Sequence, residues 1–327
     1  MTLQRALGRS GIAVSAMGLG CWAIGGPFWS GSEPHGWGEV NDDESIRAIQ
    51  RALDLGITFF DTANVYGAGH SERILGKAVS DRRSSVVIAT KFNSLFDEQT
   101  RQVTGASAQP ADIRKACEDS LRRLNTDVID LYQFHDNGYP ADQAEQVRDT
   151  LEALVSEGKI KTYGWSTDFT DRAEVFARGP RCSTIQLQLN VLEDNPSMVA
   201  LCERENLAAI NRGPLAMGLL TGKYTAETRP GIDDVRGEKS PSWMKYFQQG
   251  KPDPDWLKKV QAVREVLTHD GRTLSQGAIG WLWARSHLTI PIPGFRTVEQ
   301  VEENCKTLEK GPLTSDQFAE IEKIMGR

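Results

Sequence analysis

Eight short apolar runs, rich in branched residues, recur along the chain, and most are followed by a longer amphipathic segment. They are AMGLGC (16–21), ITFFD (57–61), SVVIATK (85–91), VIDLYQFH (128–135), KTYGWS (161–166), TIQLQLN (184–190), LAAINR (207–212) and LTIPIPG (288–294). Alternating strands and helices with no strand-only region indicate a parallel sheet. Eight such units predict a (β/α)8 TIM barrel rather than a doubly wound sheet, in one domain spanning residues 1–327.

Three segments depart from a minimal barrel. LGRSGIAVS (7–15) places turn residues between short runs and predicts a small N-terminal β-hairpin. The stretch 214–254 is long and irregular, which is typical of a functional or mobile loop. TLSQGAIGWLWARS (273–286) predicts an extra helix before the last strand, and capping-box spacings at Thr297–Gln300 and Thr314–Gln317 predict the starts of the final two helices.

The charge and cysteine content exclude several classes of protein. A net charge of −6 argues against nucleic acid or an anionic membrane as the main partner, and favours a small-molecule substrate. The five cysteines are scattered without zinc-site spacing, so we expect no metal and buried thiols in a reducing cytoplasm. The uncharged stretch 10–32 is interrupted by glycines and a proline, and therefore predicts a strand and a loop rather than a membrane span.

Four proton-handling side chains fall where barrel strands end. Asp61, Lys91 and His135 close three of the predicted strands, and Tyr66 follows one of them within a short loop. Singly, each has a structural interpretation: a helix cap, a solvated strand end, a core histidine or a packing tyrosine. Because active sites of such barrels lie at the carboxyl ends of the strands, all four are expected to converge at one rim.

This set of residues makes sense as a tuned proton donor. An unperturbed tyrosine titrates near pH ~10, and a neighbouring ammonium group lowers that pKa. Lys91 can supply the ammonium and Asp61 can hold Lys91 in place. His135 can then hydrogen-bond a substrate oxygen on which negative charge develops.

The motifs DTANVYG, ATKF and DLYQFH resemble the catalytic tetrad of the aldo-keto reductases, carried here by Asp61, Tyr66, Lys91 and His135. GLGCWAIGG, GLLTGKY and IPIPGFRTVEQVEEN resemble further family patterns in the same order, over nearly the whole chain. The resemblance implies an NADP(H)-dependent oxidoreductase that reduces aldehydes or ketones to alcohols by hydride transfer.

The resemblance also implies a set of cofactor-binding residues across the barrel mouth. They are Gly20, Trp22, Asp61, Ser166, Gln186, Arg212, Gly213, Pro214, Leu215, Gly218, Leu219, Lys223, Gly294, Arg296, Thr297, Gln300 and Asn304. Ser166 and Gln186 correspond to residues that hold the nicotinamide carboxamide. Three positions depart from common family patterns: Thr167, Leu189, and Arg212, whose planar guanidinium can stack in place of an aromatic ring.

We expect NADP in preference to NAD on grounds of charge. Arg296 precedes the helix predicted to begin at Thr297, so its guanidinium and the first free N–H groups could converge on the extra phosphate. Glu299, Glu302 and Glu303 oppose this expectation, although helical spacing turns Glu302 away from Gln300.

The sequence also suggests another fold and two other functions. The run GLGCWA nearly matches a dinucleotide fingerprint, but a Gly/Pro/Trp loop follows it instead of a helix, so a Rossmann fold is rejected. A Schiff-base aldolase using Lys91 is the rival enzyme class, although Asp61 would raise the pKa of that lysine. A cofactor-binding sensor or accessory protein with little turnover is the rival outside catalysis.

Overall fold

The structure is a computed structural model that describes residues 3–327. Its centre is an eight-stranded parallel sheet in the order β16-β13-β12-β11-β10-β7-β6-β3. The strands are β3 (Leu19–Gly20), β6 (Phe59–Asp61), β7 (Val87–Phe92), β10 (Ile129–Phe134), β11 (Ile160–Ser166), β12 (Cys182–Gln188), β13 (Ala208–Arg212) and β16 (Thr289–Pro291). Each strand overlaps one of the eight predicted runs, with β7, β11 and β12 extending one or two residues beyond theirs, so the predicted barrel is confirmed.

The two edge strands of this sheet come together and close the barrel. The Gly18 amide donates to the Pro291 carbonyl at 3.0 Å, and the Gly20 amide donates to the Pro293 carbonyl at 3.0 Å. A parallel bridge between Gly20 and Gly294 continues the contact beyond the end of β16. Closure leaves no free sheet edge and gathers all the strand ends into one ring.

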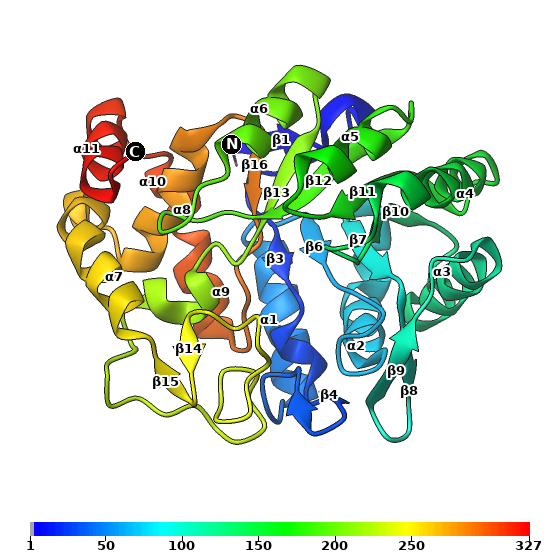
Figure 1. Cartoon of the computed structure of the whole chain (residues 1–327), viewed down its shortest axis with the longest axis horizontal. Coiled ribbons are helices and arrows are strands. Elements are labelled where there is room, and N and C mark those ends of the chain that lie inside the picture. The colour runs from blue at the N-terminus through cyan, green and yellow to red at the C-terminus, as the bar shows by residue number, and fades with distance from the viewer. Residues whose placement is uncertain (1–2) are drawn as a thin grey trace.

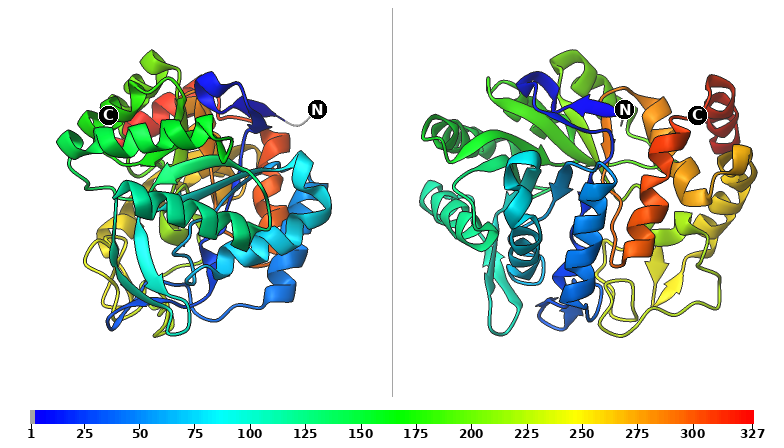
Figure 2. Two further views of the ribbon diagram at one scale, coloured as in Figure 1. Left: turned by 90° about the vertical axis from the view of Figure 1, so that its right-hand side faces the viewer. Right: turned by 180° about the vertical axis from the view of Figure 1, so that it is seen from behind.

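Helices surround the barrel on its outside (Figure 1). They are α1 (Asp42–Asp54), α2 (His70–Val79), α3 (Pro110–Leu124), α4 (Ala144–Ser156), α5 (Thr170–Ala177), α6 (Pro196–Glu205), α7 (Pro254–Leu267), α8 (Leu274–Arg285), α9 (Val298–Cys305), α10 (Thr307–Lys310) and α11 (Ser315–Met325). The helices α1 and α9 lie side by side (Figure 2), where Arg51 forms an ion pair with Glu302 at 2.8 Å. The first and last barrel units are therefore tied together on the outside as well.

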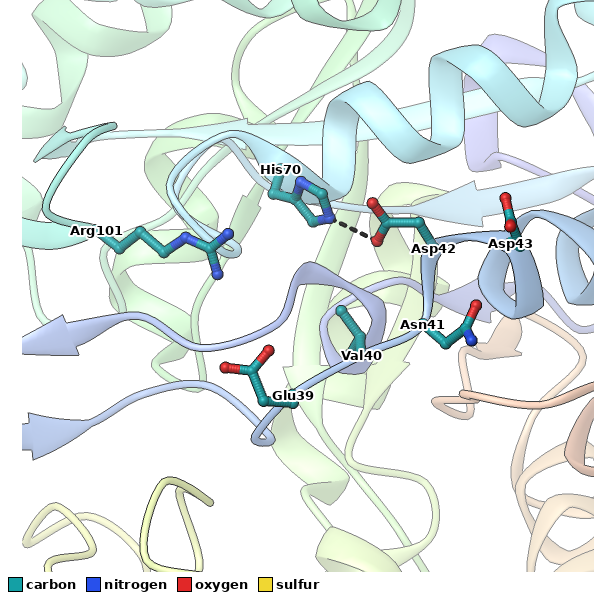
Figure 3. Close-up of a pocket in the computed structure, with 7 residues that line it drawn as sticks. All are labelled: Glu39, Val40, Asn41, Asp42, Asp43, His70 and Arg101. Carbon is teal, nitrogen blue, oxygen red and sulfur yellow. Dashed lines mark hydrogen bonds and ion pairs between the residues drawn. The ribbon is translucent and has the colours of Figure 1, made fainter.

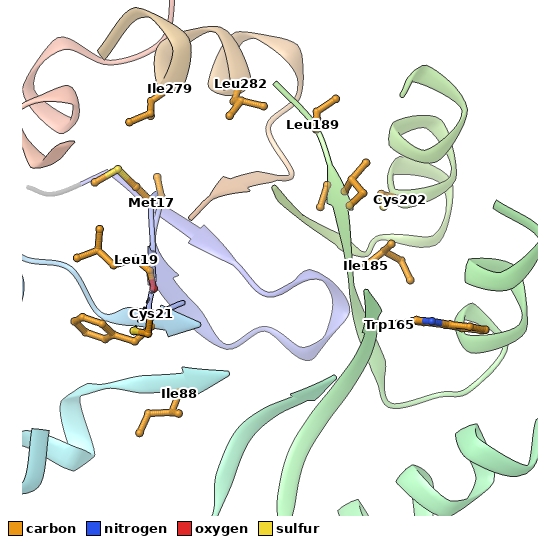
Figure 4. Close-up of a cluster of buried hydrophobic side chains, with 14 of the residues drawn as sticks. Met17, Leu19, Cys21, Ile88, Trp165, Ile185, Leu189, Cys202, Ile279 and Leu282 are labelled. Carbon is orange, nitrogen blue, oxygen red and sulfur yellow. Dashed lines mark hydrogen bonds between the residues drawn. The ribbon is translucent and has the colours of Figure 1, made fainter. Parts of the chain in front are cut away.

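The core has two layers. Inside the barrel, a small cluster includes Phe59, Leu131 and Ile290. A larger cluster fills the space between the strands and the helices, with Trp165 and Ile185 on the strand side and Ile279 on α8 (Figure 4). Burying apolar side chains on both faces of the sheet is what a parallel barrel requires.

The predicted N-terminal hairpin is present and covers one end of the barrel. It consists of β1 (Gln4–Ala6) and β2 (Ala13–Ser15), paired antiparallel. Leu7 and Val14 are buried in the cluster inside the barrel. Arg9 donates from its side chain to the carbonyls of Ala177, Gly179 and Cys182, at 2.6 to 2.8 Å. The hairpin therefore closes the end opposite the strands' carboxyl ends (Figure 1).

Insertions crowd the other end of the barrel. A small sheet is built from β4 (Trp29–Ser30), β5 (Glu33–Pro34), β8 (Ser94–Asp97) and β9 (Gln102–Ala106). The irregular stretch 214–254 contains a 3-10 helix, Ala216–Thr221, and the short pair β14 (Phe247–Gln248) and β15 (Lys251–Pro252). This long segment and the small sheet surround the mouth into which the predicted active-site residues point.

The capping motifs are partly as predicted. Thr314 and Gln317 form a reciprocal capping box at the start of α11. Thr297 accepts from the Gln300 amide at the start of α9, but the Gln300 side chain accepts from the Arg296 amide instead of returning to Thr297. A further box, Thr273 with Gln276, begins α8. The short α10 lies between α9 and α11, so the end of the chain holds one more helix than predicted.

The turn after Tyr66 depends on a glycine. Gly67 has a φ of +60°, and a Cβ atom there would lie 1.8 Å from the Gly25 carbonyl oxygen. The loop that carries Tyr66 therefore packs its backbone against the 3-10 helix Ala23–Gly25. Only glycine permits both the left-handed conformation and this close approach.

We predict that Gly67→Ala destabilises the protein more than Gly11→Ala does. Gly11 also has a positive φ, of +70°, but no atom lies within 4 Å of the position of its Cβ. Gly11→Ala should therefore cost only the left-handed penalty of about 1–2 kcal/mol, whereas Gly67→Ala adds an overpacking cost of about 1–3 kcal/mol. Denaturant unfolding of both variants measures the difference, and equal losses would contradict the close approach.

Candidate active site

Neighbouring strands deliver the four predicted catalytic residues to one end of the barrel. Asp61 ends β6, Lys91 lies near the end of β7, and His135 directly follows β10. Tyr66 lies in the loop between β6 and α2. In the sheet β6 pairs with β7 and β7 with β10, so the three strand ends are adjacent.

Lys91 is the centre of this group. Its side chain is fully buried, and its ammonium donates to the Asp61 carboxylate, to the Thr62 carbonyl at 2.8 Å and to the Tyr66 hydroxyl at 3.3 Å. These three partners use all three N–H bonds of the ammonium. These contacts fix the Lys91 ammonium in place, with one of its N–H bonds directed at the Tyr66 hydroxyl oxygen.

The second carboxylate oxygen of Asp61 is also fully engaged. The side-chain amides of Gln133 and Gln186 each donate to it at 2.8 Å. Gln186 was expected to hold the cofactor carboxamide, and here it supports Asp61. Gln133 was not predicted, although it precedes His135 by two residues and so lies on the same face of β10. It also pairs in register with Lys91.

Burial and neighbouring charges shift the pKa values of Tyr66 and Lys91 in opposite directions. Burial raises the pKa of Tyr66, and the nearby Lys91 ammonium offsets only part of that rise. Burial works to lower the pKa of Lys91, but the Asp61 carboxylate and Tyr66 outweigh it, so that pKa is raised. The sequence predicts that Lys91 brings the pKa of Tyr66 below its usual value, and the structure contradicts this prediction, since that pKa is raised. At neutral pH Tyr66 is therefore a protonated phenol beside a charged lysine.

His135 is neutral in this environment. Burial, followed by the charges of Lys91 and Arg212, lowers the pKa of its imidazole well below the usual value. The ring stands edge-on to Tyr66, with 5.9 Å between centroids. Its Nδ1 atom is buried without a hydrogen-bond partner in the part of the chain that the structure describes. A neutral imidazole beside the phenol can donate one hydrogen bond to a small ligand.

A cavity of about 1260 Å³ opens above these residues. It is lined by Tyr66, His135 and most of the predicted cofactor residues: Gly20, Trp22, Asp61, Ser166, Gln186, Arg212, Gly213, Pro214, Leu215, Gly218, Lys223, Gly294, Arg296, Gln300 and Asn304. Three predicted residues lie outside the lining. Lys91 is buried behind Tyr66, Leu219 belongs to the core, and Thr297 serves as the cap of α9.

Aromatic side chains form one rim of the cavity. Trp22 stacks on Tyr66 with 5.8 Å between ring centroids, and Trp37 meets Trp22 edge-on at 5.2 Å. Trp243 lies 6.3 Å from Trp22 and is half-exposed. This rim gives the entrance near the phenol an apolar wall suited to the carbon skeleton of a small molecule.

Arg212 reaches the cavity from the end of β13 and is held by two side chains that the sequence argument did not single out. Its guanidinium forms an ion pair with Asp168 and donates to the Gln188 side chain at 3.2 Å. Asp168 follows β11 by two residues, and Gln188 ends β12. Both could have been anticipated only by listing polar residues at every strand end.

At the far end of the cavity, Arg296 ties two loops together. Its guanidinium donates to the Trp37 carbonyl at 3.0 Å and to the Glu39 carbonyl. Lys223 lines the same end and forms no ion pair among residues 3–327, and the charges of Arg236 and Arg296 add to burial in lowering its pKa. Lys223 and Arg296 therefore bring two positive charges to this end, neither of them in a salt bridge within the part of the chain that the structure describes.

The N-terminus of α9 differs from the expected arrangement. The Val298 amide donates to the Glu44 carboxylate at 2.9 Å, so a side chain from α1 already occupies the first turn. Glu299 and Glu303 line the cavity, whereas Glu302 pairs with Arg51 outside it. We predicted that Arg296 and free N–H groups of this helix would bind one anion together. Arg296 does lie at the start of α9, but the Val298 N–H is not free, because it donates to Glu44.

Comparison with known proteins agrees with this geometry. The model of the Aldo/keto reductase family matches residues 16–325. The chain belongs to the aldo/keto reductase family. The aldo-keto reductase YhdN of Bacillus subtilis is 32% identical over 97% of this chain and 91% of its own.

Solved aldo-keto reductases share the fold over nearly the whole chain. An enzyme from Bacillus halodurans, in its holo form, has a TM-score of 0.80 at 27% identity, covering 99% of this chain and 96% of its own. A glycerol dehydrogenase from Gluconobacter oxydans has a TM-score of 0.80 at 31% identity, covering 97% and 93%. An enzyme from Klebsiella pneumoniae in complex with NADP and acetate has a TM-score of 0.72 at 23% identity, covering 98% and 95%.

A second, smaller hollow lies beside the start of α1 and shares no lining residue with the large cavity. It measures about 300 Å³ and is lined by Glu39, Val40, Asn41, Asp42, Asp43, His70 and Arg101, as Figure 3 shows. The His70 ring binds the Asp42 carboxylate at 2.8 Å. Its polar groups come from the loop before α1, from the first residues of α1 and α2, and from Arg101, none of which lines the large cavity.

Within residues 3–327, no three His, Cys, Asp or Glu side chains group in a way that could hold a metal ion. All five cysteines are free and buried, as expected. None of the helices in this part of the chain combines the length and apolar character needed to cross a membrane.

The state of His135 leads to a pH prediction. Because burial keeps its pKa low in the folded protein, the unfolded chain takes up a proton below pH ~6.5 that the folded protein does not. Wild type should therefore lose stability relative to His135→Gln as the pH falls from 8 to 5, by up to about 1.4 kcal/mol per pH unit below that point. Denaturant unfolding measures the difference.

The matched control is His287→Gln, at an exposed position. It should keep the pH dependence of wild type. A His135→Gln protein whose stability runs parallel to wild type across the same range would show that His135 titrates normally in the folded state.

Proposed function

We propose that this protein is an NADP(H)-dependent oxidoreductase that reduces an aldehyde or ketone to an alcohol. The observation that carries the proposal is the position of the Tyr66 hydroxyl at the cavity, 3.3 Å from the fully buried Lys91 Nζ and beside the His135 ring. The raised pKa of Tyr66 and the lowered pKa of His135 make the phenol a proton donor beside a neutral imidazole. A proton donor, a charge that stabilises its conjugate base, and a hydrogen-bond donor for an oxygen are what carbonyl reduction requires.

In this mechanism the bound nicotinamide supplies the hydride, and the chain supplies the proton. Tyr66 donates its proton to the carbonyl oxygen, and Lys91 stabilises the phenolate that remains. Asp61 keeps Lys91 charged and fixed, with Gln133 and Gln186 holding the carboxylate. His135 hydrogen-bonds the same oxygen as negative charge develops on it.

The cavity fits a dinucleotide of this kind. Its lining runs from Tyr66 and His135 to Gln300 and Asn304 on α9, so residues near the phenol and residues of α9 face one continuous space of about 1260 Å³. Gly213 and Gly218, with φ of +61° and +98°, lie along it and allow close approach of the backbone. Arg212 would lie against the nicotinamide, and Lys223, Arg236 and Arg296 would face the phosphates.

The aromatic rim and the family favour a small carbonyl or alcohol as substrate, and the relative from Gluconobacter oxydans is described as a glycerol dehydrogenase. Five buried free thiols favour the cytoplasm.

A Schiff-base aldolase is disfavoured because the raised pKa of Lys91 keeps its amine protonated, which removes the nucleophile. A sensor with little turnover has no need of the Tyr66–Lys91 contact. Borohydride trapping of a carbonyl substrate on Lys91 would favour the aldolase.

We predict that Tyr66→Phe lowers kcat by about 10²–10⁴-fold while NADPH binding stays near that of wild type, since only the proton donor is removed. Stopped-flow NADPH oxidation with a panel of aldehydes and ketones measures the rate. Tyr163→Phe, which removes a hydroxyl bound to Glu152 at 2.7 Å outside the cavity, is the matched control and should retain activity. A Tyr66→Phe enzyme with nearly full turnover would remove Tyr66 from the mechanism.

We predict that Arg296→Ala reduces kcat/KM for NADPH much more than for NADH, because in the proposed binding mode the guanidinium would hold the extra phosphate of NADPH. Arg296 also ties down the loop through the carbonyls of Trp37 and Glu39, so some loss with both cofactors is expected. Arg101→Ala, whose guanidinium donates to the Pro27 carbonyl at 3.4 Å on the other side of the β4–β5 pair, should affect both cofactors equally. Equal losses in Arg296→Ala would mean that Arg296 does not read the phosphate.

A further inference from the structure

The guanidinium of Arg212 is paired with a carboxylate, that of Asp168, which has no role in the proposed reaction. One carboxylate oxygen of Asp168 forms an ion pair with Arg212. The other accepts a hydrogen bond from the backbone N–H of Gln188 at 2.7 Å. The side-chain oxygen of Gln188 in turn accepts a hydrogen bond from the Arg212 guanidinium at 3.2 Å. All three residues line the cavity, and the two charged side chains are about 30% exposed, at 31% for Arg212 and 27% for Asp168.

Asp168 is itself fixed on several sides. Its amide donates to the Asn137 side chain at 2.8 Å, and its carbonyl accepts from the Asn195 side chain at 3.1 Å. With the Gln188 amide on one carboxylate oxygen and Arg212 on the other, the residue has little freedom to turn away. The carboxylate therefore holds the Arg212 guanidinium in one position at the end of β13.

The charge of Arg212 reaches the catalytic groups. It is among the causes that lower the pKa of His135, and it opposes the burial that raises the pKa of Tyr66. A cofactor ring placed against Arg212 would feel the same charge. The oxidised nicotinamide is a cation and the reduced ring is neutral, so an uncompensated guanidinium repels only the oxidised form.

We propose that Asp168 is a positioning residue that sets how much of the positive charge of Arg212 reaches the nicotinamide, and thereby sets the balance between binding of NADP⁺ and NADPH. This inference rests on the proposed function, in which the ring lies against Arg212. Asp168 holds the guanidinium plane in place and neutralises it, which lets both redox forms occupy one site. Without the carboxylate, the site would favour the reduced cofactor.

The test compares the dissociation constants of NADP⁺ and NADPH, measured by quenching of tryptophan fluorescence, in three proteins. In Asp168→Asn, which keeps the shape of the side chain, the ratio of the NADP⁺ constant to the NADPH constant should rise by about threefold or more. In Arg212→Gln the ratio should fall. The two opposite shifts distinguish an electrostatic role from simple loss of packing, which would weaken both redox forms together.

A control and a second measurement complete the test. Glu174→Gln makes the same change in net charge at an exposed ion pair with Arg204 on the outer helices, and should leave the ratio unchanged. In Asp168→Asn the pH at which Tyr66 ionises should also move down, because unneutralised Arg212 stabilises the phenolate.

The possible results separate the two claims. If wild type binds neither NADP⁺ nor NADPH, the proposed function fails and this inference fails with it. If wild type binds both and Asp168→Asn leaves the ratio unchanged, the role of Asp168 is overturned while the proposed function stands.

Discussion

The buried ion pair between Lys91 and Asp61 is the interaction on which the candidate site depends. Removing two charges from water costs several kcal/mol per ion, and the pair persists only when every remaining donor and acceptor is satisfied. Thr62, Tyr66, Gln133 and Gln186 supply those partners here. The pair is therefore better explained by its effect on Tyr66 than by any contribution to stability.

The barrel makes such an arrangement possible. Parallel strands place their carboxyl ends in one ring, so residues that are distant in sequence meet without any special loop. The N-terminal hairpin closes the opposite end, and the closed sheet fixes the ring on both sides. The mobile or variable parts of such a fold can then be confined to the insertions at the mouth.

Much of this was predictable from the sequence, because it depends on short-range patterns. Apolar runs and helical stripes located all eight strands, and polar strand ends located Asp61, Lys91 and His135. The identity of side-chain partners was not predictable in the same way. Glu44 on α1 binds the first turn of α9, and Asp168 after β11 binds Arg212 at the end of β13, with β12 between them. Only the assembled fold shows these contacts.

The direction of the Tyr66 pKa was wrong for a related reason. A sequence reveals that a lysine is near a tyrosine, but it does not reveal how deeply both are buried, and burial is the larger influence here. Lys91 therefore limits the rise in the pKa of Tyr66 instead of reversing it. Without the Lys91 ammonium, the pKa of Tyr66 would be higher still, and the phenol would be a weaker acid for the proposed proton transfer.

The most direct test of that claim is a spectroscopic titration of Tyr66 in wild type and in the double variant Lys91→Met, Asp61→Asn, which removes both charges and leaves no unpaired ion in the core. The same titration on a Tyr66→Phe protein identifies the Tyr66 signal. Because Lys91 is the larger of the two charge effects on the phenol, the account predicts that its pKa rises in the double variant. An unchanged or lower pKa would contradict the account.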